Sequence, residues 1–460
     1  MNRNKGFLIG IFILFSISIK GSAQDTHYWT HQYGTRSTLL GGLVIGSILD
    51  LSGTYYNPGG LSLIKDPETI MAAKIFQYPS ITLKGFAGGD VDVNSSNLSP
   101  APSLVAGMIK FKWLGKHWLG YSVLTRHEVK LGLSGSVIES RDVLIDSPGE
   151  EDIATDFRLN EDLSEPWWGI TWSYRVNNHF GIGISQYAIF RSHRVNFQTL
   201  AEALTTDGEI AMTIYKRDFN YSNYRMLWKL GLAFDFDRIT LGLTFTTPSV
   251  KLYGSGSSGV NVTVVRQDID DDGINDNYMA ADYQYDLDSN YRTPLSLGIG
   301  VTYKFENFRL YGSAEWFCRI DKYEVLNVED FTVQSTGENL PNKVTHELGN
   351  VLNFGFGMEY TFNQNLKTYS SFTTDFSARK PDTETNLSVT DWNIYHIMGG
   401  TTFKILRYSL TVGIGYALGK RQTMERLDPI PEDLQEKLLG TTSQYEFKYS
   451  SFKFLLGFAF

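Results

Sequence analysis

The densest group of possible metal ligands is an acidic stretch in the second half of the chain. Residues 268–276 read Asp-Ile-Asp-Asp-Asp-Gly-Ile-Asn-Asp. Hard cations prefer several carboxylate oxygens that converge on one point, and the central glycine permits the tight wrap that this requires. The spacing predicts a Ca²⁺ site formed by Asp268, Asp270, Asp272 and Asp276. A solvated acidic loop tip would have the same composition and is the alternative.

This stretch resembles the calcium loops of dockerin and thrombospondin-type repeats. It departs from an EF-hand, because Met279 stands where that loop has its bidentate glutamate. No other feature of the sequence calls for a cofactor. Ca²⁺ in an extracellular loop is therefore the one cofactor expected, and the function does not require it.

The sequence contains few features that would support catalysis. The chain has eight histidines, but their spacing is not typical of a catalytic triad or a metal site, and no G-x-S-x-G motif occurs. His127, His193, His346 and His396 fall in or near strand ends or loops, where a histidine more often forms interfacial hydrogen bonds. We expect a protein that is not an enzyme. A protease or phospholipase embedded in a barrel stays an alternative.

A second motif, residues 57–61, suggests rigidity rather than catalysis. It consists of Asn57, Pro58, Gly59, Gly60 and Leu61. Pro58 fixes its own backbone and restricts the residue before it, and the glycines allow turns that other residues resist. The asparagine amide can satisfy backbone groups where water is scarce. An ordinary Pro-Gly turn would satisfy the same pattern.

The segment that contains this motif, residues 24–65, does not alternate as a strand would. Residues 39–51 are apolar enough to predict a short helix, interrupted at Gly46. The segment is too apolar to lie free in water and too short to form a domain. We therefore expect it to be a plug inside a barrel.

Gly41-Gly42, Asp50, Ser52 and residues 57–61 together resemble the plug region of the outer-membrane long-chain fatty-acid transporters, the FadL/TodX-type family. The family's usual motif is Asn-Pro-Ala-Gly-Leu, so Gly59 replaces an alanine. The resemblance implies an antiparallel barrel of fourteen strands with an N-terminal plug, or hatch, in the bacterial outer membrane. It also implies passive uptake of hydrophobic or amphipathic small molecules such as fatty acids, with exit sideways through the wall.

The elements that must hold this plug are strands. In residues 446–460 large apolar side chains occupy every second position, ending on Phe458 and Phe460. A period of two indicates a strand with one apolar face. In a soluble sandwich such a strand would be a sticky open edge, whereas a barrel pairs its last strand with its first. The terminal phenylalanine also resembles the assembly signal of outer-membrane barrels, so the barrel-assembly machinery is an expected partner.

Short polar turns alternate with long connections along residues 66–460, and in transmembrane barrels the short turns face the periplasm. The alternation predicts about fourteen strands. The short turns are 114–116, 177–178, 235–237, 306–307, 363–365 and 406–407. The long connections are 85–101, 131–165, 195–220, 253–292, 321–348, 378–390 and 421–445. Two pieces of these connections, 198–204 and 431–439, carry helix start and stop signals.

The two faces of the strands differ in composition. Apolar residues of 408–418, 239–245 and 352–362 would face lipid, while Gly, Ser and Thr alternate with them. The inward phase is mixed, which favours a lumen for apolar or amphipathic cargo over a plain water pore. It contains Lys110, Lys112, Lys229, Arg309, Glu315, Lys453, Tyr187, Ile189, Tyr311, Phe317, Tyr369, Trp392, Ile394 and Met398. Packing of the plug would account for any one of these residues equally well.

The N-terminus indicates that the chain is exported. Arg3 and Lys5 precede an apolar run, and Gly21-Ser22-Ala23 offers a cleavage site, so residues 1–23 are predicted to be a signal peptide. Aromatic residues make up 14% of the chain and the net charge is -9, which suits a barrel with aromatic girdles and argues against a nucleic-acid partner. Lipid and a hydrophobic ligand are the expected partners of a chain treated as a monomer. Three alternatives stay open: a secretion-system anchor, a barrel enzyme and a purely structural barrel.

Overall fold

The computed structural model describes residues 26–64, 70–86, 91–96, 99–109, 115–141, 147, 149–267, 275–380, 383, 385, 387, 392–405, 408–423 and 445–459. The predicted signal peptide, Asp268, Asp270, Asp272, the predicted helix 431–439 and Phe460 lie outside these residues.

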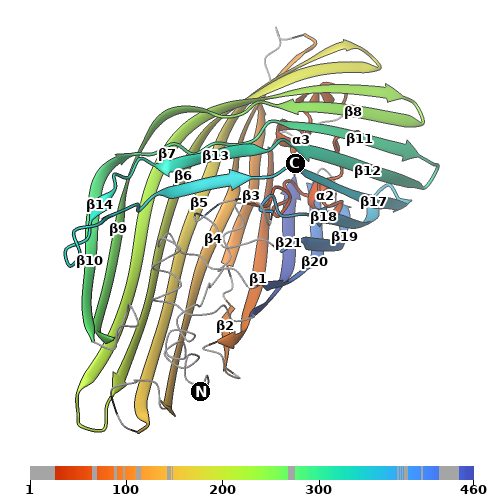
Figure 1. The fold of residues 1–460 in the computed structure, drawn as a ribbon. Coiled ribbons are helices and arrows are strands. Elements are labelled where there is room, and N and C mark those ends of the chain that lie inside the picture. Colours follow the sequence, from red (N-terminus) through yellow and green to blue (C-terminus); the bar gives the residue numbers. More distant parts are fainter. Residues whose placement is uncertain are drawn as a thin grey trace.

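Antiparallel strands form a closed ring in the described part of the chain (Figure 1). β1 pairs with β3, and the pairing continues in chain order to β21, which pairs back to β1 from Met71↔Ala459 to Lys84↔Glu446. β2 (Val91–Ser96), β9 (Val250–Gln267) and β10 (Asp276–Asp288) stand beside the ring. The prediction of about fourteen strands is confirmed. The ring consists of β1 (Ile70–Phe86), β3 (Ser99–Ile109), β4 (His117–Arg141), β5 (Glu151–Asn177), β6 (Phe180–Leu204), β7 (Ile210–Phe236), β8 (Ile239–Thr246), β11 (Ser296–Lys304), β12 (Phe308–Phe317), β17 (Val351–Asn363), β18 (Leu366–Asp375), β19 (Ile394–Ile405), β20 (Tyr408–Thr423) and β21 (Tyr445–Ala459).

The predicted faces of the strands are confirmed. Along β17, Leu352, Phe354 and Phe356 are exposed, whereas Asn353 and the neighbouring inward glycines are buried. Because similar apolar side chains lie exposed on most strands of the ring, the barrel presents a lipid-facing band. The predicted inward residues are buried or half-buried wherever the structure describes them; Lys110 and Lys112 lie outside that part.

No described helix is long and apolar enough to cross a membrane.

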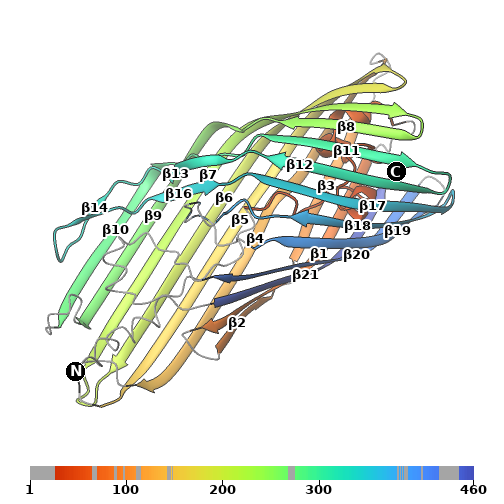
Figure 2. The same ribbon diagram turned by 45° about the vertical axis from the view of Figure 1, so that its right-hand side comes forward.

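β4 to β7 are much longer than a membrane requires. Each has 25 to 27 residues, whereas a tilted strand crosses the hydrocarbon in about 9–11. On the outer face of β5, Trp168 and Ile170 are replaced further out by Asp156, Arg158 and Asp162. The outer parts of these strands therefore stand in water as an extension of the barrel, which Figure 2 shows continuing beyond the shorter strands.

The strands correct the predictions for five ranges. Residues 131–165 and 195–220 are mostly strand rather than loop, and 198–204 belongs to β6 rather than to a helix. The helix propensity of residues 198–204 does not decide their structure, because β5 and β7 pair with this segment on both sides. Residues 253–292 likewise contain the β9–β10 hairpin. Residues 321–348 contain β13 (Ile320–Leu326), β14 (Phe331–Thr332), β15 (Asn339–Leu340) and β16 (Val344–Leu348).

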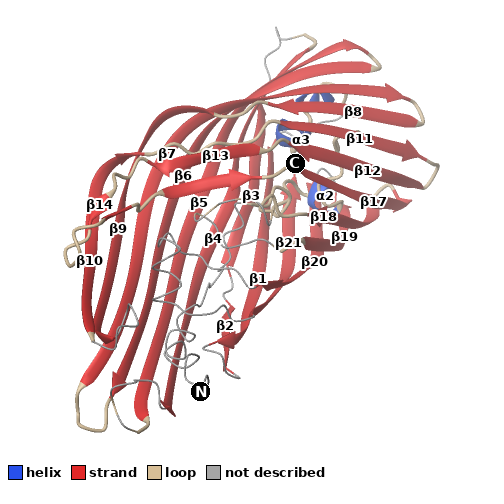
Figure 3. Ribbon diagram, viewed as in Figure 1, coloured by secondary structure: helices blue, strands red, loops and turns tan. Residues whose placement is uncertain are grey.

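The plug segment lies inside the ring. Three short helices, α2 (Arg36–Leu39), α3 (Gly53–Tyr56) and α4 (Pro58–Leu61), are surrounded by strands, as Figure 3 shows for α2 and α3. Most of residues 26–64 are buried. The helix predicted at 39–51 is wrong: α2 ends at Leu39, because Gly41 and Gly42 both take positive φ, a conformation that terminates helices.

Candidate functional site

Asn57 joins three parts of the molecule. Its Nδ2 donates to the carbonyl of Ile45 at 2.8 Å and to that of Leu232 in β7 at 3.0 Å. Its Oδ1 accepts from Gly59 N at 3.1 Å and so caps α4, with Pro58 at the first helical position. One amide therefore holds α4, the preceding turn of the plug and the barrel wall together.

The plug backbone rests directly on the backbone of the wall at several glycines. A Cβ at Gly59 would lie 2.5 Å from the carbonyl oxygen of Gly231, and one at Gly242 would lie 1.8 Å from that of Ile45. A Cβ at Gly300 would lie 2.3 Å from Gly46 N. This close approach accounts for Gly59 where an alanine was expected, since an added methyl group would force the plug off the wall.

Asp50 shapes the first half of the plug. Its carboxylate accepts hydrogen bonds from Arg36 N at 3.2 Å, Ser37 Oγ at 3.1 Å and Ser52 N at 3.0 Å. Ser52 Oγ donates in turn to Ser37 Oγ at 2.8 Å. The carboxylate thus ties α2 to the start of α3, which explains why Asp50 and Ser52 occur together in the motif.

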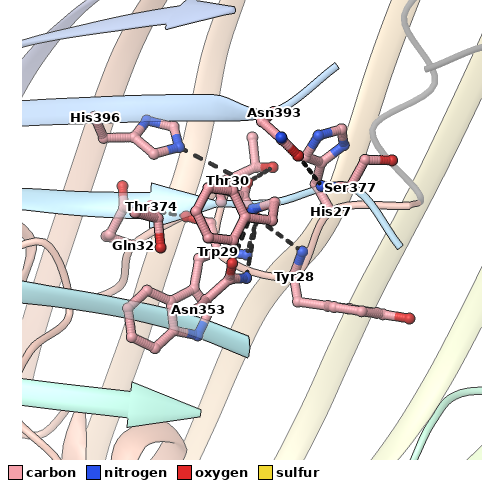
Figure 4. A network of polar contacts seen from close by, with 12 residues as sticks. His27, Tyr28, Trp29, Thr30, Gln32, Asn353, Thr374, Ser377, Asn393 and His396 are labelled. Carbon is pink, nitrogen blue, oxygen red and sulfur yellow. Dashed lines mark hydrogen bonds and ion pairs between the residues drawn. The ribbon is translucent and has the colours of Figure 1, made fainter. Parts of the chain in front are cut away.

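The residues before α2, 26–33, form a strap that is neither helix nor strand, and one wall carboxylate holds it. Asp375 in β18 accepts from Tyr28 N at 3.1 Å, Trp29 N at 2.9 Å and Thr30 Oγ1 at 2.6 Å. Figure 4 shows these strap residues converging on one point, with Asn353 and His396 approaching from the wall.

Two further contacts fix the strap. Lys453 Nζ in β21 donates to the carbonyl of Thr30 at 2.8 Å. Trp29 Nε1 donates at 3.0 Å to Glu315, whose carboxylate also accepts from Ser296 Oγ at 2.7 Å and lies 3.7 Å from Lys229 Nζ. The strap is therefore held by polar contacts with ring strands, with the segment between β18 and β19 and with Tyr56 of α3.

A charged belt lies on the inner face of three neighbouring ring strands. Glu165 in β5 pairs with Arg191 in β6 at 2.9 Å and with Arg225 in β7 at 3.0 Å, and these side chains are at most 1% exposed. The guanidinium of Arg191 lies 3.8 Å from the ring centroid of Tyr291, and that of Arg225 lies 4.8 Å away. Trp167 Nε1 donates to Glu165 at 2.9 Å. The belt is rigid, because each member has at least two partners.

A cavity of about 50 Å³ lies between the belt and the strap, with room for roughly three to five water molecules. Aromatic rings, two carboxylates and three basic side chains make up much of its wall. These residues are Tyr28, Tyr55, Trp167, Tyr291, Phe317, Glu165, Glu315, Arg126, His127 and Lys229.

No family model matches the chain, and no curated protein matches it. Among solved structures, a Pseudomonas aeruginosa FadL homologue superposes with a TM-score of 0.59 at 12% identity, over 94% of this chain and 99% of that one. The Pseudomonas putida toluene transporter TodX gives 0.59 at 12%, over 93% and 98%. The Ralstonia pickettii toluene transporter TbuX gives 0.55 at 13%, over 94% and 99%. The chain has the FadL-type fold.

Within this FadL-type barrel, burial disfavours the charged forms of plug side chains in and near the cavity. Burial raises the pKa of Tyr33 to about 12, and it also raises that of Tyr55 well above its usual range. Burial lowers the pKa of His31 well below its usual range, and the nearby cations Lys453 and Arg126 lower it further. The charge around the cavity therefore comes from the wall.

The residues singled out at 57–61 lie together in the structure, since they form α4 and its cap. Of the four predicted metal ligands, the structure places only Asp276, which begins β10. The other three aspartates lie outside the described residues. Within the described ranges no group of His, Cys, Asp or Glu has the geometry of a metal site.

The sequence missed the belt. Glu165, Arg191 and Arg225 share the inward phase of β5, β6 and β7, so a continued period of two would have found them. Glu165 was instead assigned to the end of a long connection. The residue pairing of the FadL-type wall is what brings the three together.

The acidic stretch leads to the first testable prediction. Calorimetry with Ca²⁺ on the folded barrel should show binding, and replacing Asp270 and Asp272 by asparagine should abolish it, because the loop would lose two of its four carboxylate ligands. If wild-type protein gives no heat and Ca²⁺ gives no protection from proteolysis, the stretch is only acidic.

Proposed function

We propose that the chain is a bacterial outer-membrane channel for passive uptake of hydrophobic or amphipathic small molecules such as fatty acids. The observation that carries this proposal is the lumen. A closed ring contains an apolar interior in its extension, and beneath it lie a small aromatic cavity and a plug held largely by hydrogen bonds.

The inner face of the extension supports an apolar cargo. The inward side chains of β4 and β5 beyond the belt include Val129, Leu131, Leu133, Phe157, Leu159 and Leu163, all buried. The lumen of a water-filled porin is polar instead. Similar folds fit this function: TodX and TbuX are toluene transporters, and CymD is a monoaromatic hydrocarbon channel.

The strap and plug supply the gate in this proposal. A ligand that enters the cavity meets Tyr55 of α3 and Tyr28 of the strap, which Asp375 and Glu315 hold. Displacing the strap exchanges these hydrogen bonds for contacts with ligand or water, so thermal energy suffices and no energy source is needed. The motif around Asn57 keeps the rest of the plug in place. Exit sideways through the wall is carried over from the family resemblance.

The cargo itself distinguishes this function from its alternatives. Mass spectrometry of material that co-purifies with the barrel should detect small hydrophobic molecules, because the apolar lumen retains them through detergent extraction. Large secreted proteins in the same preparation would instead indicate a secretion-system anchor, and turnover of lipid or peptide would indicate an enzyme. A barrel that carries neither cargo nor activity would contradict the proposal and favour a structural role.

A further inference from the structure

The two edges of β10 are bonded in different ways. One edge pairs with β9 along the whole strand. The other edge meets residues 329–335, the segment that includes β14. There a side-chain amide takes the place of a neighbouring strand: Gln334 Nε2 donates to the carbonyl of Ala281 at 2.7 Å, and Gln334 Oε1 accepts from Ala281 N at 2.8 Å. We call this second edge, 279–284 against 329–335, the seam.

The other hydrogen bonds of the seam also depend on side chains. Ser335 Oγ accepts from Met279 N at 3.1 Å, while Ser335 N donates to the carbonyl of Met279 at 3.2 Å. Gln284 Nε2 donates to the carbonyl of Glu329 at 2.8 Å, and Gln284 Oε1 accepts from Glu329 N at 2.9 Å. These contacts are exposed, so water can replace them at little net cost. Exposed bonds of this kind mark the parts of a protein that open locally.

The seam holds the tip of a lid, residues 320–348, whose base is fixed more firmly. At the base, Asn290 N donates to the carbonyl of Val325 at 2.8 Å, and Asn327 N donates to that of Asp288 at 3.1 Å. β13 follows β12, and β16 precedes β17, so both ends of the lid continue into ring strands. Figure 2 shows the lid running from those strands to β14 beside β10. The tip can therefore move about a fixed base.

The apolar interior of the extension lies directly beneath the seam. Phe331 and Val333 of the lid and Tyr278 and Ala280 of β10 are buried in one apolar cluster, which also contains the inward residues of β4 and β5. The seam stands beyond the lipid-facing band, because β10 aligns through β9 with the outer part of β7. Separation of the lid tip from β10 would thus open the apolar interior sideways to the surrounding water.

We propose that the seam is the entrance of the channel, through which a hydrophobic molecule passes when the lid tip leaves β10. This proposal rests on the proposed function. Water replaces the polar bonds of the open seam, and the entering molecule replaces the apolar contacts of Phe331 and Val333. The opposite edge of β10 stays closed, since a continuous backbone ladder holds it to β9.

The test locks the seam with a disulfide. Met279→Cys and Ser335→Cys are combined in a Cys318→Ser background, since Cys318 is the one cysteine of the chain. Both side chains are exposed, so neither substitution alters the apolar interior. The oxidised variant should lower cellular uptake of the hydrophobic probe N-phenylnaphthylamine to that of cells without the barrel. Dithiothreitol should restore uptake to the level of the Cys318→Ser background.

Thr332→Cys combined with Asn339→Cys is the matched control. These two exposed residues face each other across the β14–β15 hairpin, so their disulfide stays within the lid and does not tie it to β10. Uptake by this variant should be the same before and after reduction.

Unchanged uptake with the seam disulfide formed, or equal losses with both disulfides, would overturn the entrance and leave the channel intact. Wild-type uptake no faster than that of cells without the barrel would contradict the channel itself. If the seam variant does not assemble or does not oxidise, Gln334→Ala decides. It removes both bonds to Ala281 and should raise the initial uptake rate roughly two- to tenfold, the range for one exposed hydrogen bond. An unchanged rate would overturn the entrance.

Discussion

Replacing Gly242 by alanine is expected to push the plug off the wall and to open a leak for small polar solutes. The new Cβ would lie 1.8 Å from the carbonyl oxygen of Ile45 and 2.8 Å from Asn57 Nδ2, so it would strike the contact that holds the motif to the wall. Overpacking of this kind costs about 1–3 kcal/mol. If this strain acts only on the state in which the plug is seated, it raises the population of displaced plugs by roughly 5- to 150-fold relative to wild type.

A change on the plug side should have the same effect. In Gly60→Val the added Cβ alone would lie 2.4 Å from Ile48 Cγ1, so α4 would separate from the turn before it. Asn57→Ala should act in the same direction, since it removes the hydrogen bonds to Ile45 and Leu232. All three variants should keep the barrel folded.

Ion conductance across planar bilayers measures this leak, with heat-modifiable gel mobility as the check on folding. Gly120→Ala is the matched control, because it adds the same methyl group to an inward glycine whose nearest neighbours lie at 3.4 Å and 3.6 Å. Wild-type conductance in Gly242→Ala and Gly60→Val alike would show that the plug does not seal the barrel.

Replacing Glu165 by glutamine should destabilise the folded barrel by about 3–5 kcal/mol, the typical cost of removing one partner from a buried ion pair. The amide keeps the shape of the side chain and an acceptor for Trp167, but it leaves Arg191 and Arg225 buried without a counter-charge. The free energy of unfolding from a urea titration measures the effect.

Glu202→Gln serves as the control, since Glu202 lies exposed on the outer face of β6 and the change should stay within about 0.5 kcal/mol. A loss below about 1 kcal/mol in Glu165→Gln would mean that water or another anion reaches the belt. In that case the belt would not be the rigid upper limit of the cavity.

Much of the barrel could be predicted because a strand's two faces follow directly from alternate residues. The apolar outward residues of β17 and β20 indicated lipid, and the short turns after β5, β7, β11 and β17 fixed the number of crossings in that half of the ring. The plug motif could be predicted because Asn57 and Pro58 constrain the chain locally, whatever surrounds them.

The extension could not be predicted so readily, since its apolar face reverses. In β5 the large apolar side chains point outward at Trp168 and Ile170 but inward at Leu159 and Leu163. If one alternating pattern is expected along the whole strand, the pattern breaks where the apolar face reverses. The sequence of the outer half then resembles a polar loop. The position of the reversal also marks where the wall leaves the membrane.

The inward position of Arg126 in β4 could not be predicted for a related reason. A bulge shifts the phase by one residue, and only the pairing with β5 shows where the extra residue lies. The polar contacts of the strap depend likewise on which strands the ring brings together: Asp375 and Lys453 lie far from Thr30 in sequence, and nothing local links them.

The central claim is that a hydrophobic molecule crosses this barrel past a seated plug. The most direct measurement compares the uptake of one hydrophobic probe with that of a small polar dye. Cells that display the wild-type barrel are set against cells that lack it. The account predicts faster uptake of the hydrophobic probe with unchanged entry of the dye. Equal uptake of the probe with and without the barrel, or a parallel rise for the dye, would contradict it.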